Sequence, residues 1–109
     1  MDLSVAERYV LLDILPKEGT YSTLKILHQL RQSLSFSEEE VKEFGIIETV
    51  LPDGRNSVSW NPEIQNSVDL RIGEQATFLI MQALKNLDKN EKLTEREFGL
   101  YEKFVNGTH

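Results

Sequence analysis

The hydrophobic period of this chain changes near residue 46, and that change most constrains its fold. Before it, apolar residues recur every three to four positions, as in amphipathic helices. After it, the β-branched segment 46–51 leads into the turn Pro-Asp-Gly-Arg at 52–55, and residues 56–60 alternate between apolar and polar. The chain therefore combines helices with a β-hairpin, which places it in the α+β class.

Three helix-start signals precede the hairpin. A second start, at Thr20 or Ser22, opens a helix that runs to about residue 33. The first and third starts are capping boxes, in which a serine and a glutamate three residues later satisfy each other's free backbone N–H groups. These pairs are Ser4 with Glu7 and Ser37 with Glu40. Pro16 ends the first helix, and Gly45 suits the left-handed position that ends the third.

The segment after the hairpin predicts one further strand and two helices. Residues 68–72 alternate strictly, and a helix is expected over 74–87. A capping box at Thr94 and Glu97 opens the last helix. We therefore expect an α+β fold of about five helices with a small antiparallel sheet, either the hairpin alone or a three-stranded sheet. Residues 1–109 form one domain, with three helices and the hairpin in 1–60 and a strand and two helices in 67–105.

Acidic residues outnumber basic residues in this chain, which carries a net charge of −6. Residues 37–72 hold eight acidic and three basic residues, so this third alone contributes −5. Such a surface repels nucleic acid. The absence of cysteine excludes disulfides and thiolate metal sites. The N-terminus has no signal-peptide pattern, and the longest apolar run, 78–81, is too short to span a bilayer, so we expect a cytoplasmic protein without a membrane partner.

Three helices followed by a hairpin is also the order of a winged-helix DNA-binding domain, so the N-terminal part is predicted to be winged-helix-like. In that arrangement the helix before the hairpin enters the major groove. Here residues 37–43 contain four carboxylates and one lysine, which disfavours that mode. The alternative function is a winged-helix-type nucleic-acid-binding regulator that uses other basic residues, namely Lys25, His28, Arg31 and Arg55.

No arrangement of residues predicts catalysis or metal binding. The two histidines, His28 and His109, lie far apart, and neither belongs to a His-x-x-x-His motif. A resemblance of 88–99 to a calcium loop fails, because Leu93 stands where glycine is needed and Gly99 where glutamate is needed. We therefore expect no catalytic residue, no metal and no cofactor, and predict that the protein is not an enzyme.

The last two helices carry more apolar width than one packing face requires. Such a surplus indicates either central burial or a surface for another chain, and these alternatives are weighed equally. The partner would be another protein or a second copy of this chain. Trp60 is either a cover for the sheet or an exposed anchor. The candidate interaction residues are therefore Phe78, Met81, Tyr101, Phe104 and Trp60.

Several segments resemble uncharacterised small bacterial proteins of prophage regions. They are Leu11-Leu12 with Leu15-Pro16-Lys17-Glu18-Gly19, residues 34–40, Gly73-Glu74-Gln75-Ala76, residues 83–89, Lys92-Leu93-Thr94 and residues 100–104. The resemblance implies a phage-encoded accessory or regulatory protein and assigns no site. Together with the apolar surplus, it predicts a non-enzymatic protein-interaction or regulatory accessory protein.

Overall fold

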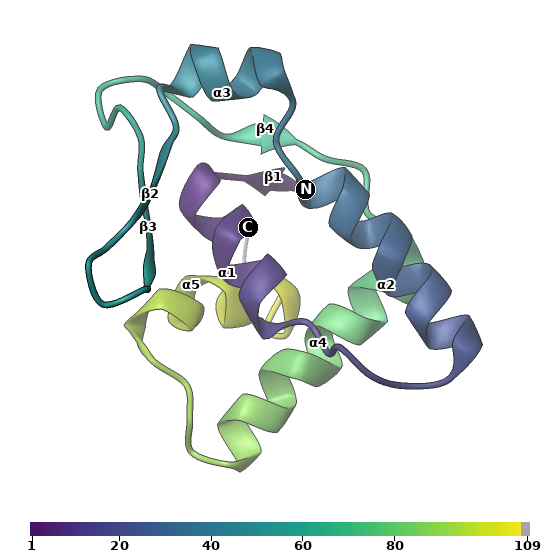
Figure 1. Cartoon of the computed structure of the whole chain (residues 1–109). Helices are drawn as coiled ribbons and strands as arrows, with labels where there is room; N and C mark the ends of the chain where they lie inside the picture. Colours follow the sequence, from purple (N-terminus) through teal and green to yellow (C-terminus); the bar gives the residue numbers. More distant parts are fainter. Residues whose placement is uncertain (108–109) are drawn as a thin grey trace.

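The computed structural model describes residues 1–107, which form the expected α+β fold with five helices and short antiparallel strands (Figure 1). The elements, in chain order, are β1 (Asp2–Leu3), α1 (Val5–Ile14), α2 (Tyr21–Leu34), α3 (Glu38–Phe44), β2 (Ile47–Val50), β3 (Asn56–Ser59), β4 (Val68–Asp69), α4 (Glu74–Lys89) and α5 (Glu95–Phe104). His109 lies outside the described residues.

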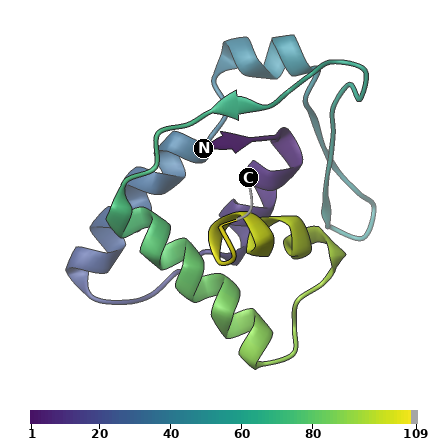
Figure 2. The same cartoon turned by 180° about the vertical axis from the view of Figure 1, so that it is seen from behind.

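Four helices build the body of the molecule, and the β2–β3 hairpin projects from it. Helix α4 packs against α5 and α2, while α1 contacts all three. The hairpin and α2 lie on opposite sides in both views, and α3 lies at the rim above the N-terminal strand (Figures 1 and 2). No helix within residues 1–107 has the length and apolar character needed to cross a membrane.

The predicted capping boxes at the first and third helices are confirmed. The Ser4 hydroxyl accepts a hydrogen bond from the Glu7 backbone N–H at 3.2 Å, and the Glu7 carboxylate accepts one from the Ser4 N–H at 3.0 Å. The Ser37 and Glu40 pair does the same, with both distances at 3.1 Å. Thr20 is the residue that caps α2. These reciprocal bonds satisfy donors that a helix N-terminus otherwise leaves free.

The capping box predicted at the last helix is wrong in its bonding. Thr94 does occupy the N-cap position of α5, but its side chain accepts no backbone hydrogen bond there. Its hydroxyl instead donates to the Glu97 carboxylate, which also accepts from Arg96 Nε at 3.2 Å. Glu97 is buried, so its charge needs polar partners around it and takes these two.

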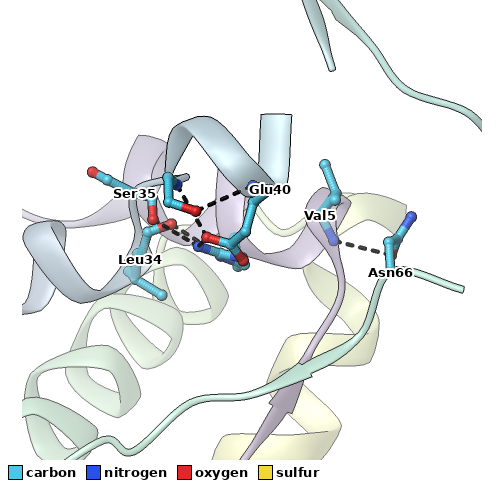
Figure 3. Close-up of polar contacts among 7 residues, drawn as sticks. Val5, Leu34, Ser35, Glu40 and Asn66 are labelled. Carbon is cyan, nitrogen blue, oxygen red and sulfur yellow. Dashed lines mark hydrogen bonds and ion pairs between the residues drawn. The ribbon is translucent and has the colours of Figure 1, made fainter. Parts of the chain in front are cut away.

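Only the first two residues of the strand predicted over 68–72 form a strand, β4, and β4 does not join the hairpin in a three-stranded sheet. The hairpin pairs β2 with β3 in the register Ile47↔Ser59 to Val50↔Asn56, whereas β4 pairs with β1 through Asp2↔Asp69 and Leu3↔Val68. The connection 60–67 carries the chain away from the hairpin and across to the N-terminus (Figure 1). Asn66 fixes this crossing, because its side-chain oxygen accepts from the Val5 N–H at 3.2 Å (Figure 3).

Two apolar clusters hold the described residues together. The larger one, here called the helical core, unites leucine-rich faces of α1, α2, α4 and α5; its buried members are Leu3, Leu11, Leu15, Leu27, Leu30, Leu34, Ile80, Leu84, Leu100 and Phe104. The smaller one, here called the hairpin cluster, joins the base of the hairpin to α1 and α3; it contains Val5, Tyr9, Phe36, Phe44, Ile46, Val58, Trp60 and Val68.

Candidate interaction surfaces

The five predicted interaction residues do not form one surface. Phe78 on α4 is 58 % exposed, while Met81 and Tyr101 are half-buried against the helical core. Phe104 is only 6 % exposed, so the prediction that it faces a partner is corrected. Its burial follows from the position of α5 against α1 and α4, which encloses Leu100 and Phe104 one turn apart.

Trp60 belongs to the hairpin cluster and follows directly after β3. Its ring stacks on that of Tyr9 with centroids 6.4 Å apart, and the Tyr9 ring lies 4.9 Å from that of Phe36. The Tyr9 hydroxyl donates to the Glu48 carboxylate at 3.1 Å. The pKa of Tyr9 is raised to about 12, chiefly by burial of the phenol and secondly by its hydrogen bond to Glu48. Trp60 is half-buried and packs within the chain against Tyr9, and its role as a partner contact stays a prediction.

Phe78 borders a groove between α2 and α4. We call it the α2–α4 groove; its lining residues are Thr23 and Ile26 from α2 and Glu74, Gln75, Phe78, Leu79 and Gln82 from α4. The groove has a volume of about 400 Å³. A second hollow of about 530 Å³ shares Ile26, Glu74 and Gln75 with it and continues toward the start of α4. An apolar floor with polar groups beside it is typical of binding sites.

The four predicted basic residues lie in two places. Lys25, His28 and Arg31 line one hollow on the outer side of α2, together with Tyr21 and Leu24. We call these five residues the α2 face. Tyr21 is 71 % exposed, so this face also presents aromatic surface.

Arg55 lies apart from the α2 face, in the turn of the hairpin on the other side of the molecule (Figure 1). Its guanidinium binds the Asp53 carboxylate at 2.6 Å. The nucleic-acid alternative is therefore left with the three basic residues of the α2 face, because the charge of Arg55 is already paired.

Arg8 is a central polar residue that was not among the residues predicted from the sequence. It is only 1 % exposed, yet its Nε donates to the Leu34 carbonyl oxygen at 3.0 Å, and a second nitrogen donates to that of Ser35 at 2.7 Å. A third bond of 2.7 Å reaches the Glu40 carboxylate (Figure 3). The guanidinium also lies 3.9 Å from the centre of the Phe36 ring. Arg8 thus ties α1 to the end of α2 and the start of α3.

A signal for Arg8 exists in the sequence. Arg8 stands three residues after Val5 and three before Leu11, so it occupies the apolar face of α1. A buried arginine requires hydrogen-bond acceptors, and the carbonyl oxygens of Leu34 and Ser35 at the C-terminal end of α2 are such acceptors. Its hydrogen bond is also the largest cause that lowers the pKa of Glu40. This joint is structural, since it positions α3.

No group of three or more potential metal-ligating side chains converges within residues 1–107. His28 is exposed on α2.

The chain is similar to the acetyl-coenzyme A carboxylase carboxyl transferase subunit alpha of Clostridium botulinum, in the strains Eklund 17B / Type B and Alaska E43 / Type E3. In each case the identity is 28 % over 111 residues, which covers 94 % of this chain and 38 % of the relative. The chain therefore spans well under half the length of these relatives. No family model and no solved structure matches it. The resemblance to prophage proteins stays a prediction.

Proposed function

We propose that this chain is a non-enzymatic protein-interaction module that binds its partner in the α2–α4 groove. The observation that carries this proposal is the 58 % exposure of Phe78 beside Ile26 and Leu79. A large aromatic ring left in water at the edge of a groove gains apolar burial when a partner covers it. Aromatic residues in such positions supply much of the binding energy of protein interfaces.

The form of the groove favours a helical segment as the bound part of the partner. Two helices line it, and an amphipathic helix laid between them would place its apolar side on Ile26, Phe78 and Leu79. Gln75 and Gln82, which also line the groove, supply hydrogen-bonding groups. These amides would select for a partner with polar residues beside its apolar stripe.

The test compares Phe78→Ala with Phe98→Ala. Both phenylalanines are 58 % exposed, but Phe98 lies on α5 and does not line the groove. Each variant is used as bait for affinity capture from the source cells. A partner held by the wild type and by Phe98→Ala, but lost with Phe78→Ala, is expected. Loss of a binding hot spot of about 2 kcal/mol lowers affinity roughly thirtyfold.

Equal capture by both variants would show that the groove is not the binding site. Circular dichroism of the two proteins checks that neither substitution unfolds the chain. Since both side chains are largely exposed, we expect both variants to keep the wild-type helix content.

A second candidate function follows from the sequence match. The similarity covers 94 % of this chain, and the matched protein is by name one subunit of an acetyl-coenzyme A carboxylase. We therefore propose, as the alternative, that the chain contributes to carboxyl transfer within such an assembly. Calorimetric titration with acetyl-coenzyme A tests direct substrate binding. A binding heat that saturates with added acetyl-coenzyme A would favour this alternative. No binding at millimolar acetyl-coenzyme A would show that the chain does not bind this substrate directly.

A further inference from the structure

Helix α2 differs in charge from the rest of this acidic protein. The chain contains 18 acidic residues, yet none lies among the 14 residues of α2. The α2 face presents Lys25, His28 and Arg31 next to the exposed side chains of Tyr21 and Leu24. It is therefore a mixed basic and apolar surface on a molecule of net charge −6.

The basic groups of the α2 face are not neutralised within the chain. Among residues 1–107, neither Lys25 nor Arg31 lies within ion-pair distance of a carboxylate. The Arg31 guanidinium donates to the carbonyl oxygens of Leu15 and Pro16, at 3.5 and 2.7 Å, and so keeps its charge. This face attracts a negatively charged partner.

The next helix along the chain has the complementary character. Glu38, Glu39 and Glu43 are exposed on α3, and none of them forms an ion pair in the described part of the chain. Glu39 and Glu43, four residues apart, lie on one side of α3 and form an acidic face there. Both α2 and α3 lie at the rim of the molecule, joined by residues 35–37 (Figures 1 and 2).

We propose that the α2 face binds helix α3 of a second copy of this chain. A two-fold axis would make this contact twice, because the α3 of each copy would meet the α2 of the other. Lys25 and His28 would face the carboxylates of Glu39 and Glu43, which lie one turn apart on the same side of α3. This surface is separate from the α2–α4 groove, so the inference goes beyond the proposed function.

Charge also favours a second copy over a nucleic acid. Phosphates laid along α2 would approach the unpaired carboxylates of the adjacent α3 and be repelled. A two-fold related copy avoids this repulsion, because it places acidic groups over basic ones at both ends of the contact. A dimer held by such charges should be sensitive to salt, since the screening length falls from about 10 Å at 0.1 M salt to about 3 Å at 1 M.

The experiment measures self-association by sedimentation equilibrium at low salt and at about 1 M salt. We expect the wild type to dimerise at low salt and to dissociate at high salt. The double variants Lys25→Glu/His28→Glu and Glu39→Lys/Glu43→Lys should each weaken the dimer at least about tenfold. Arg31 is left intact because it holds the carbonyl oxygens of Leu15 and Pro16.

Mixing the two double variants is the decisive step. In the mixed dimer, the α2 that carries new glutamates faces the α3 that carries new lysines, so opposite charges meet. The other contact joins an unchanged basic α2 to an unchanged acidic α3, as in the wild type. A heterodimer of about wild-type affinity is therefore expected. The matched control, Lys85→Glu/Lys89→Glu, places two new acidic residues at exposed sites on α4 and should leave dimerisation unchanged.

A monomeric wild type at low salt would overturn the inference, as would equal weakening by the α4 control. A gel shift of random duplex DNA that Lys25→Glu/His28→Glu abolishes, with no dimer present, would also overturn it and assign the face to nucleic acid. Partner capture that depends on Phe78 is independent of all these results. A monomer that still shows such capture would therefore remove this inference and leave the proposed function standing.

Discussion

The helical core and the hairpin are stabilised in different ways. Four helices enclose the core, where Leu11, Leu27 and Leu84 are completely buried. In the hairpin every residue of β2 is exposed, and the base is held by Ile46 and Trp60 against Tyr9. A two-stranded hairpin is marginally stable in water by itself. The helices therefore supply the apolar burial, and the hairpin depends on its attachment to them.

The attachment consists of a few specific contacts. Arg8 ties α1 to α3 through Glu40, and Gly45 directs the chain from α3 toward β2 with a φ of 64°. Substitutions that remove apolar contacts in the helical core should therefore destabilise the whole chain. Substitutions that remove the contacts of Arg8 or Gly45 should first destabilise the hairpin end of the molecule.

The largest effect is expected in the helical core. Leu84→Ala removes a completely buried side chain from α4 and leaves a cavity, at a cost of about 2–5 kcal/mol. Urea unfolding followed by circular dichroism measures this loss. Phe78→Ala, at an exposed site on the same helix, is the control and should cost less than about 0.5 kcal/mol. Similar costs for the two variants would contradict the assignment of stability to the core.

The second largest loss of stability is expected where Arg8 attaches α1 to α3. Arg8→Met should cost about 2–3 kcal/mol, because two backbone carbonyl oxygens and Glu40 lose their donor. The cost stays below that of a fully buried pair because Glu40, which is 23 % exposed, can be hydrated. Fluorescence of Trp60 should change at lower urea than the helix signal. Arg55→Met, which breaks only a surface pair, should shift neither transition.

Acid should weaken the same joint. The Arg8 hydrogen bond holds the pKa of Glu40 below the ordinary value of 4.5. Because the folded pKa is the lower one, this stabilisation is complete above the unfolded pKa and is lost as pH falls through the folded pKa. Urea midpoints measured from neutral pH down to about pH 3 should therefore decline less steeply in Glu40→Gln than in the wild type. Parallel curves would show that Glu40 does not carry this dependence.

The smallest effect is expected at Gly45. Its left-handed backbone strains any other residue, so Gly45→Ala should cost about 1 kcal/mol and perturb the hairpin through its exit angle. Gly99 provides the opposite case, because it lies inside α5 with open space around its missing side chain. Gly99→Ala should stabilise the chain by up to about 1 kcal/mol. If Gly45→Ala and Gly99→Ala shift the unfolding midpoint in the same direction and by the same amount, this explanation from backbone conformation is wrong.

Features that depend on neighbours along the chain were predictable. The capping boxes at Ser4 and Ser37 and the turn of the hairpin involve residues within a few positions of one another, so their spacing carries the whole signal. The position of Thr94 at the start of α5 was also predicted, but its bonding was not. There the burial of Glu97 decides which group the threonine hydroxyl meets.

The helices, the hairpin and the α+β class follow from local sequence, because the spacing of apolar residues and the residue types of a turn are local properties. Contacts between distant segments instead set the pairing of β4 with β1, the enclosure of Phe104 with Phe78 left exposed, and the bonding of Arg8 to three elements. Each of these outcomes depends on which distant segment comes to lie beside a given residue. Hydrophobic pattern shows that a side chain needs burial, but packing between elements decides which partner provides it.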